Sequence, residues 1–248
     1  MIQASLERIL STVDDGAIVL DVGGWAKPFN RADVVLDYMP YATRGLYGSD
    51  GPGPERFSSS SWIQWDMCAR EPWPLADKEI DFAICSQTLE DVRDPVWVCS
   101  ELIRVAKAGY IEVPSRLEEQ TYGIQGPWVG WGHHHWIVDT SPDRVEFVFK
   151  HHVIHGKADT HFPAAFLAHL SADDRVQALW WEENFSFEER TFADPESLDE
   201  YLHSFVASEL GARGLSSLRD SPSRLQASRA PGSPMTRLRQ RALRGKQP

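Results

Sequence analysis

Short apolar runs that end in glycine or in a polar residue constrain this sequence more than any other feature. They are rich in β-branched residues, and four of them cover 17–24, 32–38, 80–86 and 108–115. Runs of this kind are typical of parallel strands that are covered on both faces. A further strand is predicted at 62–67 and a helix at 95–105. Strands separated by helices or long connections predict an α/β fold with a doubly wound, mostly parallel sheet.

The pattern changes after residue 115. Two β-rich runs, 133–139 and 145–152, flank a Pro/Asp turn at 140–144 and predict an antiparallel hairpin. In that hairpin, position 133 should face about 151, and position 135 should face about 149. Three further elements are predicted: a helix at 162–170, a strand at 185–192 and a helix at 195–209. A helix is also predicted at 1–15, before the first strand.

Length and charge indicate one domain followed by a basic tail. The chain has 248 residues and a net charge of −11. We expect a domain over 1–210, with a core at 17–115 and an extension at 116–210. The segment 211–248 holds nine basic residues and one acidic residue, and we expect it to be disordered or to form a short basic helix at 235–244. An acidic body does not attract nucleic acid, whereas the tail could contact an anionic surface weakly.

Cysteine usage and the first residues bear on the compartment. The three cysteines, Cys68, Cys85 and Cys99, show no spacing typical of a disulfide framework or a zinc site. The first residues lack the pattern of a secretory signal, and no apolar run is long enough to span a membrane. These features predict a cytoplasmic protein.

The ends of the first two strands carry the residue types of a cofactor site. The first strand ends in Asp21, Gly23 and Gly24, and the second ends in Asp37. Glycines allow a tight turn and a close approach of backbone N–H groups to a ligand. An acid after the second strand can accept hydrogen bonds from ribose hydroxyls. The glycines do not complete G-x-G-x-x-G, which argues against a dinucleotide.

The remaining motifs follow in a fixed order. The chain carries VLDVGG, ADVVLDY, WIQWDM, WPLADKEIDFAICSQTLEDVRDP and ELIRVAKAGYIEVPS. This order resembles the class I S-adenosylmethionine-dependent methyltransferases, in particular the type 11 subgroup, and the resemblance covers 17–115. It implies a Rossmann-like three-layer sandwich, S-adenosyl-L-methionine as cofactor, and methyl transfer to a small-molecule or glycan-like acceptor.

The resemblance implies a set of cofactor-binding residues: Asp21, Gly23, Gly24, Asp37, Tyr38, Asp66, Met67 and Gln87. The first three would border the methionine part, and Asp37 would hold the ribose hydroxyls. Asp66 and Met67 would lie at the adenine end, and Gln87 would line the methionine and acceptor side. Two positions depart from the family, because Trp25 and Lys27 stand where it has glycines. The alternative is therefore a methyltransferase-fold scaffold with weak or no activity.

Histidines and tryptophans gather in the predicted extension. Eight of the nine histidines lie between 133 and 169, and alternation along the hairpin would place His133 and His135 on one face. These two are the candidates for a general base. The histidines could instead be surface or packing residues, or bind a metal, as in a metal-dependent hydrolase. No carboxylate at ligand spacing supports a metal, so we assign no metal ligands. The Gly/Trp-rich segment 122–136 could cover the acceptor or simply pack.

Overall fold

The structure, a computed structural model, describes residues 1–220. Its residues form two compact units, each assembled from segments that are separate in the sequence. Unit 1 consists of Met1–Arg116, His133–Lys150 and Ser171–Thr191. Unit 2 consists of Leu117–Gly132, His151–Leu170 and the described part of the segment that starts at Phe192. The basic helix predicted at 235–244 lies outside the described residues.

The centre of unit 1 is a six-stranded sheet with the strand order β3-β2-β1-β4-β5-β8. The strands are β1 (Val19–Val22), β2 (Val34–Asp37), β3 (Trp62–Gln64), β4 (Ile80–Ser86), β5 (Ala106–Pro114) and β8 (Val176–Glu182). The first five run parallel, and β8 pairs antiparallel with β5. The predicted doubly wound, mostly parallel sheet is therefore confirmed. The antiparallel strand β8 was not predicted.

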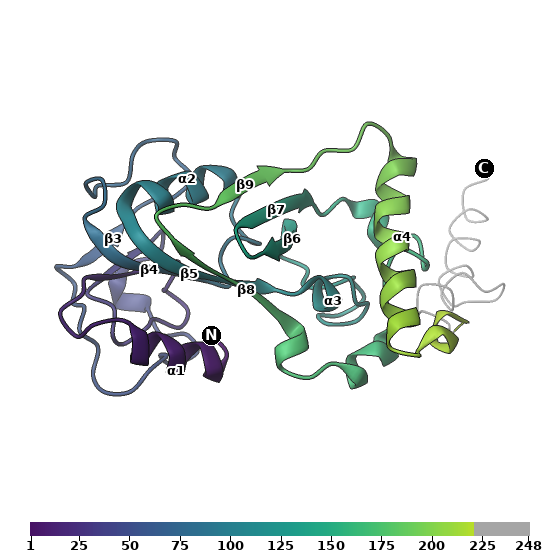
Figure 1. Cartoon of the computed structure of the whole chain (residues 1–248), viewed down its shortest axis with the longest axis horizontal. Helices are drawn as coiled ribbons and strands as arrows, with labels where there is room; N and C mark the ends of the chain where they lie inside the picture. The colour runs from purple at the N-terminus through teal and green to yellow at the C-terminus, as the bar shows by residue number, and fades with distance from the viewer. Residues whose placement is uncertain (221–248) are drawn as a thin grey trace, which may run out of the picture. The chain divides into compact units, whose positions relative to one another are not determined.

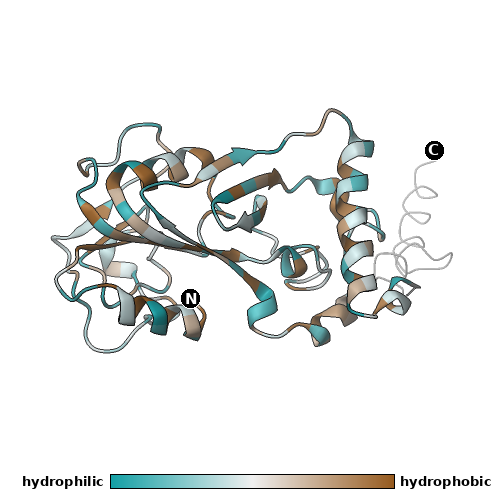
Figure 2. Cartoon of the chain, viewed as in Figure 1, coloured by the Kyte–Doolittle hydropathy of each residue, from teal (hydrophilic) through white to brown (hydrophobic). Residues whose placement is uncertain are grey.

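Helices cover both faces of this sheet. Helix α1 (Gln3–Thr12) lies on one face and α2 (Pro95–Val105) on the other (Figure 1). Successive strand residues point to opposite faces, so Val19 joins the hydrophobic cluster beneath α1, whereas Leu20 joins the cluster beneath α2. Figure 2 shows apolar brown segments along the central strands, as expected for a sheet buried on both sides. This arrangement is the predicted three-layer sandwich.

Helix α2 begins where the sequence places its start signals. The carboxylate of Asp94 caps the helix by accepting a hydrogen bond from the Trp97 N–H at 3.1 Å. Pro95 occupies the first turn, where a missing N–H costs nothing. The apolar residues Val98 and Leu102 then face the sheet.

A second, three-stranded sheet belongs to the same unit. It has the order β6-β7-β9 and contains β6 (Trp136–Ser141), β7 (Arg144–Phe149) and β9 (Ser186–Glu189). The hairpin of β6 and β7 is the one predicted, and it packs on the α2 side of the large sheet through Val138 and Phe147.

The predicted register of the hairpin is wrong by one position. Trp136 pairs with Phe149 and Ser141 with Arg144, so two residues form the turn. His133 and His134 precede β6 and lie in and beside a turn rather than in a strand. Period-two alternation therefore does not apply to them, and the predicted placement of His133 and His135 on one strand face is also wrong.

The connection from β1 to β2 is short and irregular. Residues 23–33 contain no helix, although a parallel crossover usually includes one. Helix α1, which precedes β1, covers this face of the sheet instead.

Unit 2 is built around α4 (Pro195–Ala212), which packs Val206 and Leu210 against Phe162 and Phe166. The predicted helix at 162–170 is a 3-10 segment, η3 (Ala164–His169). The remaining helical segments of the unit are η2 (His152–His155), the end of α3 (Arg116–Glu119) and η5 (Ser216–Asp220). Among residues 1–220, no helix is both long and apolar enough to cross a membrane.

Candidate functional site

The carboxyl ends of four neighbouring parallel strands bring polar residues together in unit 1. The strands are adjacent in the order β2-β1-β4-β5. Their ends carry Asp37, the turn that starts at Gly23, Gln87 and Glu112. This edge of an α/β sheet is where ligands bind in doubly wound folds.

The glycine turn after β1 fits closely against its neighbours. Gly23 has a φ of +79°, and its N–H donates to the Leu36 carbonyl at 2.9 Å. A Cβ at this position would lie 2.2 Å from Oγ1 of Thr88, and one at Gly24 would lie 2.2 Å from Oδ2 of Asp21. Both positions therefore require glycine for reasons of space.

Asp37 lies against this turn. Its Oδ2 accepts a hydrogen bond from the Trp25 N–H at 2.9 Å, and its Oδ1 accepts one from the Met39 N–H at 2.8 Å. Each carboxylate oxygen has two lone pairs, so each retains one for a ligand hydroxyl. The structure thus brings the predicted glycines and the predicted acid together.

Trp25 and Lys27, the two departures from the glycine pattern, are held by other residues. The Trp25 indole N–H donates to Oγ1 of Thr43 at 3.0 Å, in the 3-10 segment η1 (Tyr41–Thr43), and the ring packs on the α1-side cluster. The ammonium of Lys27 forms an ion pair of 2.5 Å with Asp50. The Trp25 side chain is therefore directed toward η1, and the Lys27 charge is compensated.

Buried carboxylates give the site its charge. Burial raises the pKa of Asp21 to about 7. The hydrogen bond from the Phe29 N–H lowers this pKa, and the nearby charges of Asp37 and Asp50 raise it by smaller amounts. Burial also raises the pKa of Asp37, although two backbone N–H groups stabilise its charged form. A cation bound here would stabilise the ionised form of both groups.

Glu112 on β5 extends this group of acids. It is 1% exposed and accepts hydrogen bonds from the Tyr110 hydroxyl at 2.5 Å, from Ser86 at 3.1 Å and from the Ile2 N–H at 3.0 Å. The α-amine of Met1 lies 3.6 Å from Glu112 and 3.1 Å from Asp50. Sequence reasoning missed Glu112, although a lone acid within an apolar strand was an available signal.

The four other predicted cofactor residues lie in different environments. Asp66 pairs with Arg93 at 2.7 Å and accepts from the Cys68 N–H at 3.0 Å. Burial opposes its ionisation, but these two contacts outweigh that effect and lower the pKa of Asp66. Of the remaining three, Tyr38 is 67% exposed, Met67 is buried in the α2-side cluster, and Gln87 is exposed.

Gln87 has the least favourable backbone of this group. Its φ is +55°, in the left-handed region that few residues other than glycine adopt. Its N–H donates to the Glu112 carbonyl at 2.8 Å, which fixes the end of β4 to β5. Backbone strain of this kind is concentrated at functional sites.

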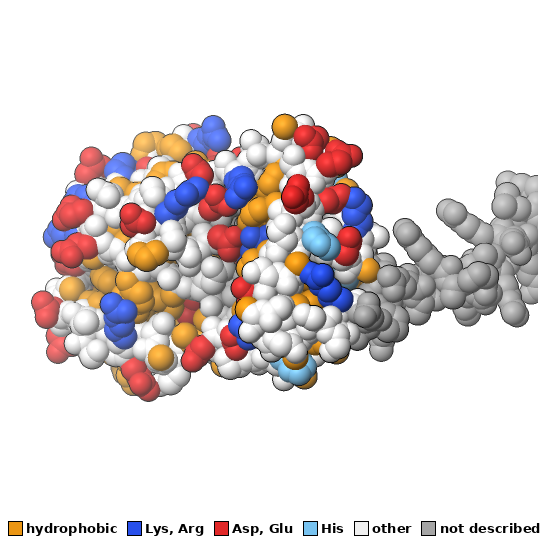
Figure 3. Space-filling view, turned by 45° about the vertical axis from the view of Figure 1, so that its right-hand side comes forward, with side chains coloured by type: hydrophobic (Ala, Val, Ile, Leu, Met, Phe, Trp, Pro, Cys, Tyr) orange, Lys and Arg blue, Asp and Glu red, His pale blue; other side chains and the backbone are white. Residues whose placement is uncertain are grey.

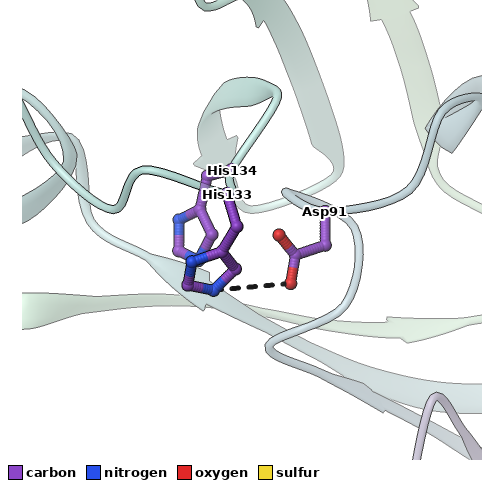
Figure 4. Close-up of side chains that lie close together, drawn as sticks. All are labelled: Asp91, His133 and His134. Atoms are coloured by element: carbon purple, nitrogen blue, oxygen red, sulfur yellow. Dashed lines mark ion pairs between the residues drawn. The ribbon is translucent and has the colours of Figure 1, made fainter. Parts of the chain in front are cut away.

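The two candidate bases have different surroundings. His133 contacts His134, with ring centroids 4.6 Å apart, and its Nε2 lies 3.9 Å from Oδ2 of Asp91 (Figure 4). His135 is exposed, and its backbone N–H donates to the Glu90 carbonyl at 2.7 Å. His133 therefore has a carboxylate beside it, a pairing that no local sequence pattern indicates.

Comparisons with known proteins give only distant similarity. No protein-family model matches the chain, and no curated protein does. A complex of the Trm112 methyltransferase activator with a candidate methyltransferase from Haloferax volcanii aligns at 18% identity, with a TM-score of 0.33, over 45% of this chain and 50% of that one. An arsenic(III) S-adenosylmethionine methyltransferase from Chlamydomonas reinhardtii aligns at 17% identity, with a TM-score of 0.30, over 46% and 50%.

A third solved structure, a SAM-dependent methyltransferase from Aquifex aeolicus, aligns at 17% identity with a TM-score of 0.32. The alignment covers 56% of this chain and 82% of that chain. In the two structures named before it, the chain spans about half of the length.

Proposed function

We propose that this chain is an S-adenosyl-L-methionine-dependent methyltransferase that acts on a small-molecule or glycan-like acceptor. The observation that carries the proposal is the hydrogen bond to Asp37 from the N–H of Trp25, the residue directly after Gly23 and Gly24; the turn and the acid follow two adjacent parallel strands. It supplies a ribose-binding acid next to a turn with no room for side chains. The motif order along the chain supports the same function.

The charge of the site favours a cationic ligand over an anionic one. Asp21 and Asp37 are both buried and interact electrostatically, and the N–H groups of Trp25 and Phe29 already donate hydrogen bonds to Asp37 and Asp21, respectively. The ammonium and sulfonium groups of the cofactor would stabilise the ionised form of Asp21, whose pKa of about 7 leaves it partly protonated at neutral pH. When bound, S-adenosyl-L-methionine supplies an activated methyl group on sulfur.

In this proposal, the protein aligns the groups and excludes water rather than forming covalent bonds. Asp37 holds the ribose hydroxyls, Asp21 and the glycine turn border the methionine part, and Gln87 lies toward the acceptor. An acceptor hydroxyl must lose a proton, and His133, with Asp91 beside it, is better placed as general base than His135.

The surface charge bears on the class of acceptor. Figure 3 shows blue basic side chains interspersed among red acidic ones on the visible face of the described residues. The first 210 residues contain 35 acidic and 16 basic side chains. A surface of this kind suits a small or uncharged acceptor better than a nucleic acid, whose phosphates require a basic surface.

Calorimetry with S-adenosylhomocysteine tests the cofactor site. The unsubstituted chain should bind it in the micromolar range. Asp37→Asn should weaken binding about 10- to 100-fold, because charge-assisted hydrogen bonds to both hydroxyls are lost. Asp77→Asn is the matched control, since Asp77 precedes β4 and is 79% exposed.

Two results would contradict this proposal. Unchanged affinity in Asp37→Asn would remove Asp37 from the binding site. Binding weaker than millimolar by the unsubstituted chain would favour the scaffold alternative, which the presence of Trp25 and Lys27 motivates.

A further inference from the structure

We propose that Asp91, His133 and His134 bind a divalent transition-metal ion. Among residues 1–220, they are the one group of three His, Cys, Asp or Glu side chains that could hold a metal ion, and their ligand atoms all lie within 4.8 Å of one another. All three belong to unit 1. Figure 4 shows the two imidazoles next to each other and the carboxylate facing them from another loop.

The donor set has the chemistry of a metal centre with open positions. Two imidazole nitrogens and one carboxylate oxygen suit Zn²⁺ and Fe²⁺, and three protein ligands leave at least one position for water or a substrate oxygen. Ligand atoms around a tetrahedral zinc ion lie about 3.4 Å apart, given bonds of about 2.0 to 2.1 Å. The Nε2–Oδ2 distance of 3.9 Å between His133 and Asp91 needs only a small side-chain rotation to reach this value.

Backbone hydrogen bonds hold the two ligand-bearing segments together. The Glu90 carbonyl accepts from the N–H groups of His135 at 2.7 Å and of Trp136 at 3.2 Å. The Val92 carbonyl accepts from the Trp136 indole at 2.8 Å. Glu90 and Val92 directly flank Asp91, and His135 and Trp136 directly follow His134. The backbone positions of the three ligands are therefore fixed by the fold, as a preorganised site requires.

The Asp91 loop is also rigid on the side of the cofactor site. The N–H groups of Asp91 and Val92 both donate to the Thr88 carbonyl, at 3.1 and 3.2 Å. Thr88 in turn packs against Gly23, where an added Cβ would lie 2.2 Å from its hydroxyl. One turn of chain thus separates the glycine turn from the candidate metal ligand.

This location suggests a role that rests on the proposed function. A metal ion at Asp91 would lie beyond the end of β4, four residues after Gln87, which the proposed function assigns to the acceptor side. It would bind a hydroxyl oxygen of the acceptor and lower its pKa, and the metal ion would then replace His133 as the group that promotes deprotonation. The hydroxyl proton would leave to solvent, the oxygen would form a bond to the methyl carbon, and the carbon–sulfur bond would break with its electron pair on sulfur.

Metal titration of the untagged, chelator-treated full chain tests the site without any methyl acceptor. Calorimetry with Zn²⁺ should give one bound ion, and Co²⁺ should give visible absorption bands of nitrogen and oxygen coordination. Asp91→Asn and His134→Asn should each weaken Zn²⁺ binding by at least about 100-fold, since even loss of a group that only supports a ligand costs about 10- to 100-fold. His135→Asn is the matched control and should retain the affinity.

The outcomes separate a built site from unspecific binding by histidines. Equal losses in His135→Asn and His134→Asn, or unchanged binding in Asp91→Asn, would overturn the proposal. Absence of Zn²⁺ and Co²⁺ binding by the folded, unsubstituted chain would overturn it as well. S-adenosylhomocysteine binding is measured separately. If the unsubstituted chain binds Zn²⁺ but not S-adenosylhomocysteine, the proposed function is wrong and the metal site is retained.

Discussion

Asp21→Asn should stabilise the chain at pH 8 by about 3 kcal/mol more than at pH 5. The folded-state pKa of Asp21 is about 7, above its ordinary value of 3.8. The folded state therefore holds this proton more tightly than the unfolded state does, and raising the pH removes stability until the pH passes about 7. Asparagine has no such proton and does not incur the loss. Urea unfolding of both chains at pH 5 and pH 8 measures the difference.

Asp81→Asn is the control for this prediction. Lys107 and the Ile18 N–H lower the pKa of Asp81, so its contribution to stability is lost only below the ordinary aspartate range. The difference in stability between this variant and the unsubstituted chain should therefore stay constant from pH 5 to pH 8. If the stability difference for Asp21→Asn is also constant from pH 5 to pH 8, Asp21 is already ionised at pH 5 and its pKa is not raised to about 7.

Gly23→Ala should cost about 3 kcal/mol of folding stability or more. The positive φ of 79° disfavours any side chain, and the new Cβ would lie 2.2 Å from the Thr88 hydroxyl oxygen. Thr88 has little freedom to move, because its hydroxyl also lies within hydrogen-bond distance of the Val22 and Ser86 carbonyls. The urea midpoint of the variant measures this loss.

Two further variants keep the Gly23 prediction testable even if the first one does not fold. Gly16→Ala is the matched control, since nothing lies within 4 Å of an added Cβ there, and it should be close to neutral. Gly23→Ala combined with Thr88→Ala should recover part of the stability, because the two closest atoms are removed. A Gly23→Ala chain as stable as Gly16→Ala would show that the turn has room that the structure denies.

Four of the five parallel strands, β1, β2, β4 and β5, were predictable because each is an apolar run inside the sheet that is largely buried. Strand β8 was missed because its residues do not form such a run: Gln177 interrupts it after one residue, Glu182 ends it, and it pairs only at the edge of the sheet. The hairpin was predicted, but its register depends on turn length. A two-residue turn at Pro142 and Asp143 shifted every expected partner by one position.

The candidate site was predictable only where it depends on the order of the strands. The contact between Asp37 and the glycine turn follows from the order of adjacent parallel strands, which motif order alone indicates. The group of Asp91 and His133 depends on a turn before β6 and on hydrogen bonds to Glu90. No local pattern encodes a contact between segments that far apart. The roles of Tyr38 and Asp66 toward a cofactor stay predictions.

The irregular connection at 23–33 should affect which nucleotides can compete for the proposed cofactor site. A helix that starts after the first strand presents aligned amide dipoles, and these dipoles stabilise the phosphates of nucleotides. Here no helix starts in 23–33, and the carboxyl groups of Asp21 and Asp37 lie against the glycine turn. The phosphates of ATP and NAD would gain no stabilisation from a helix N-terminus there and would meet the negative charge of Asp37. Abundant cellular nucleotides should therefore be poor competitors for this site, whereas a nucleoside without phosphate avoids the repulsion.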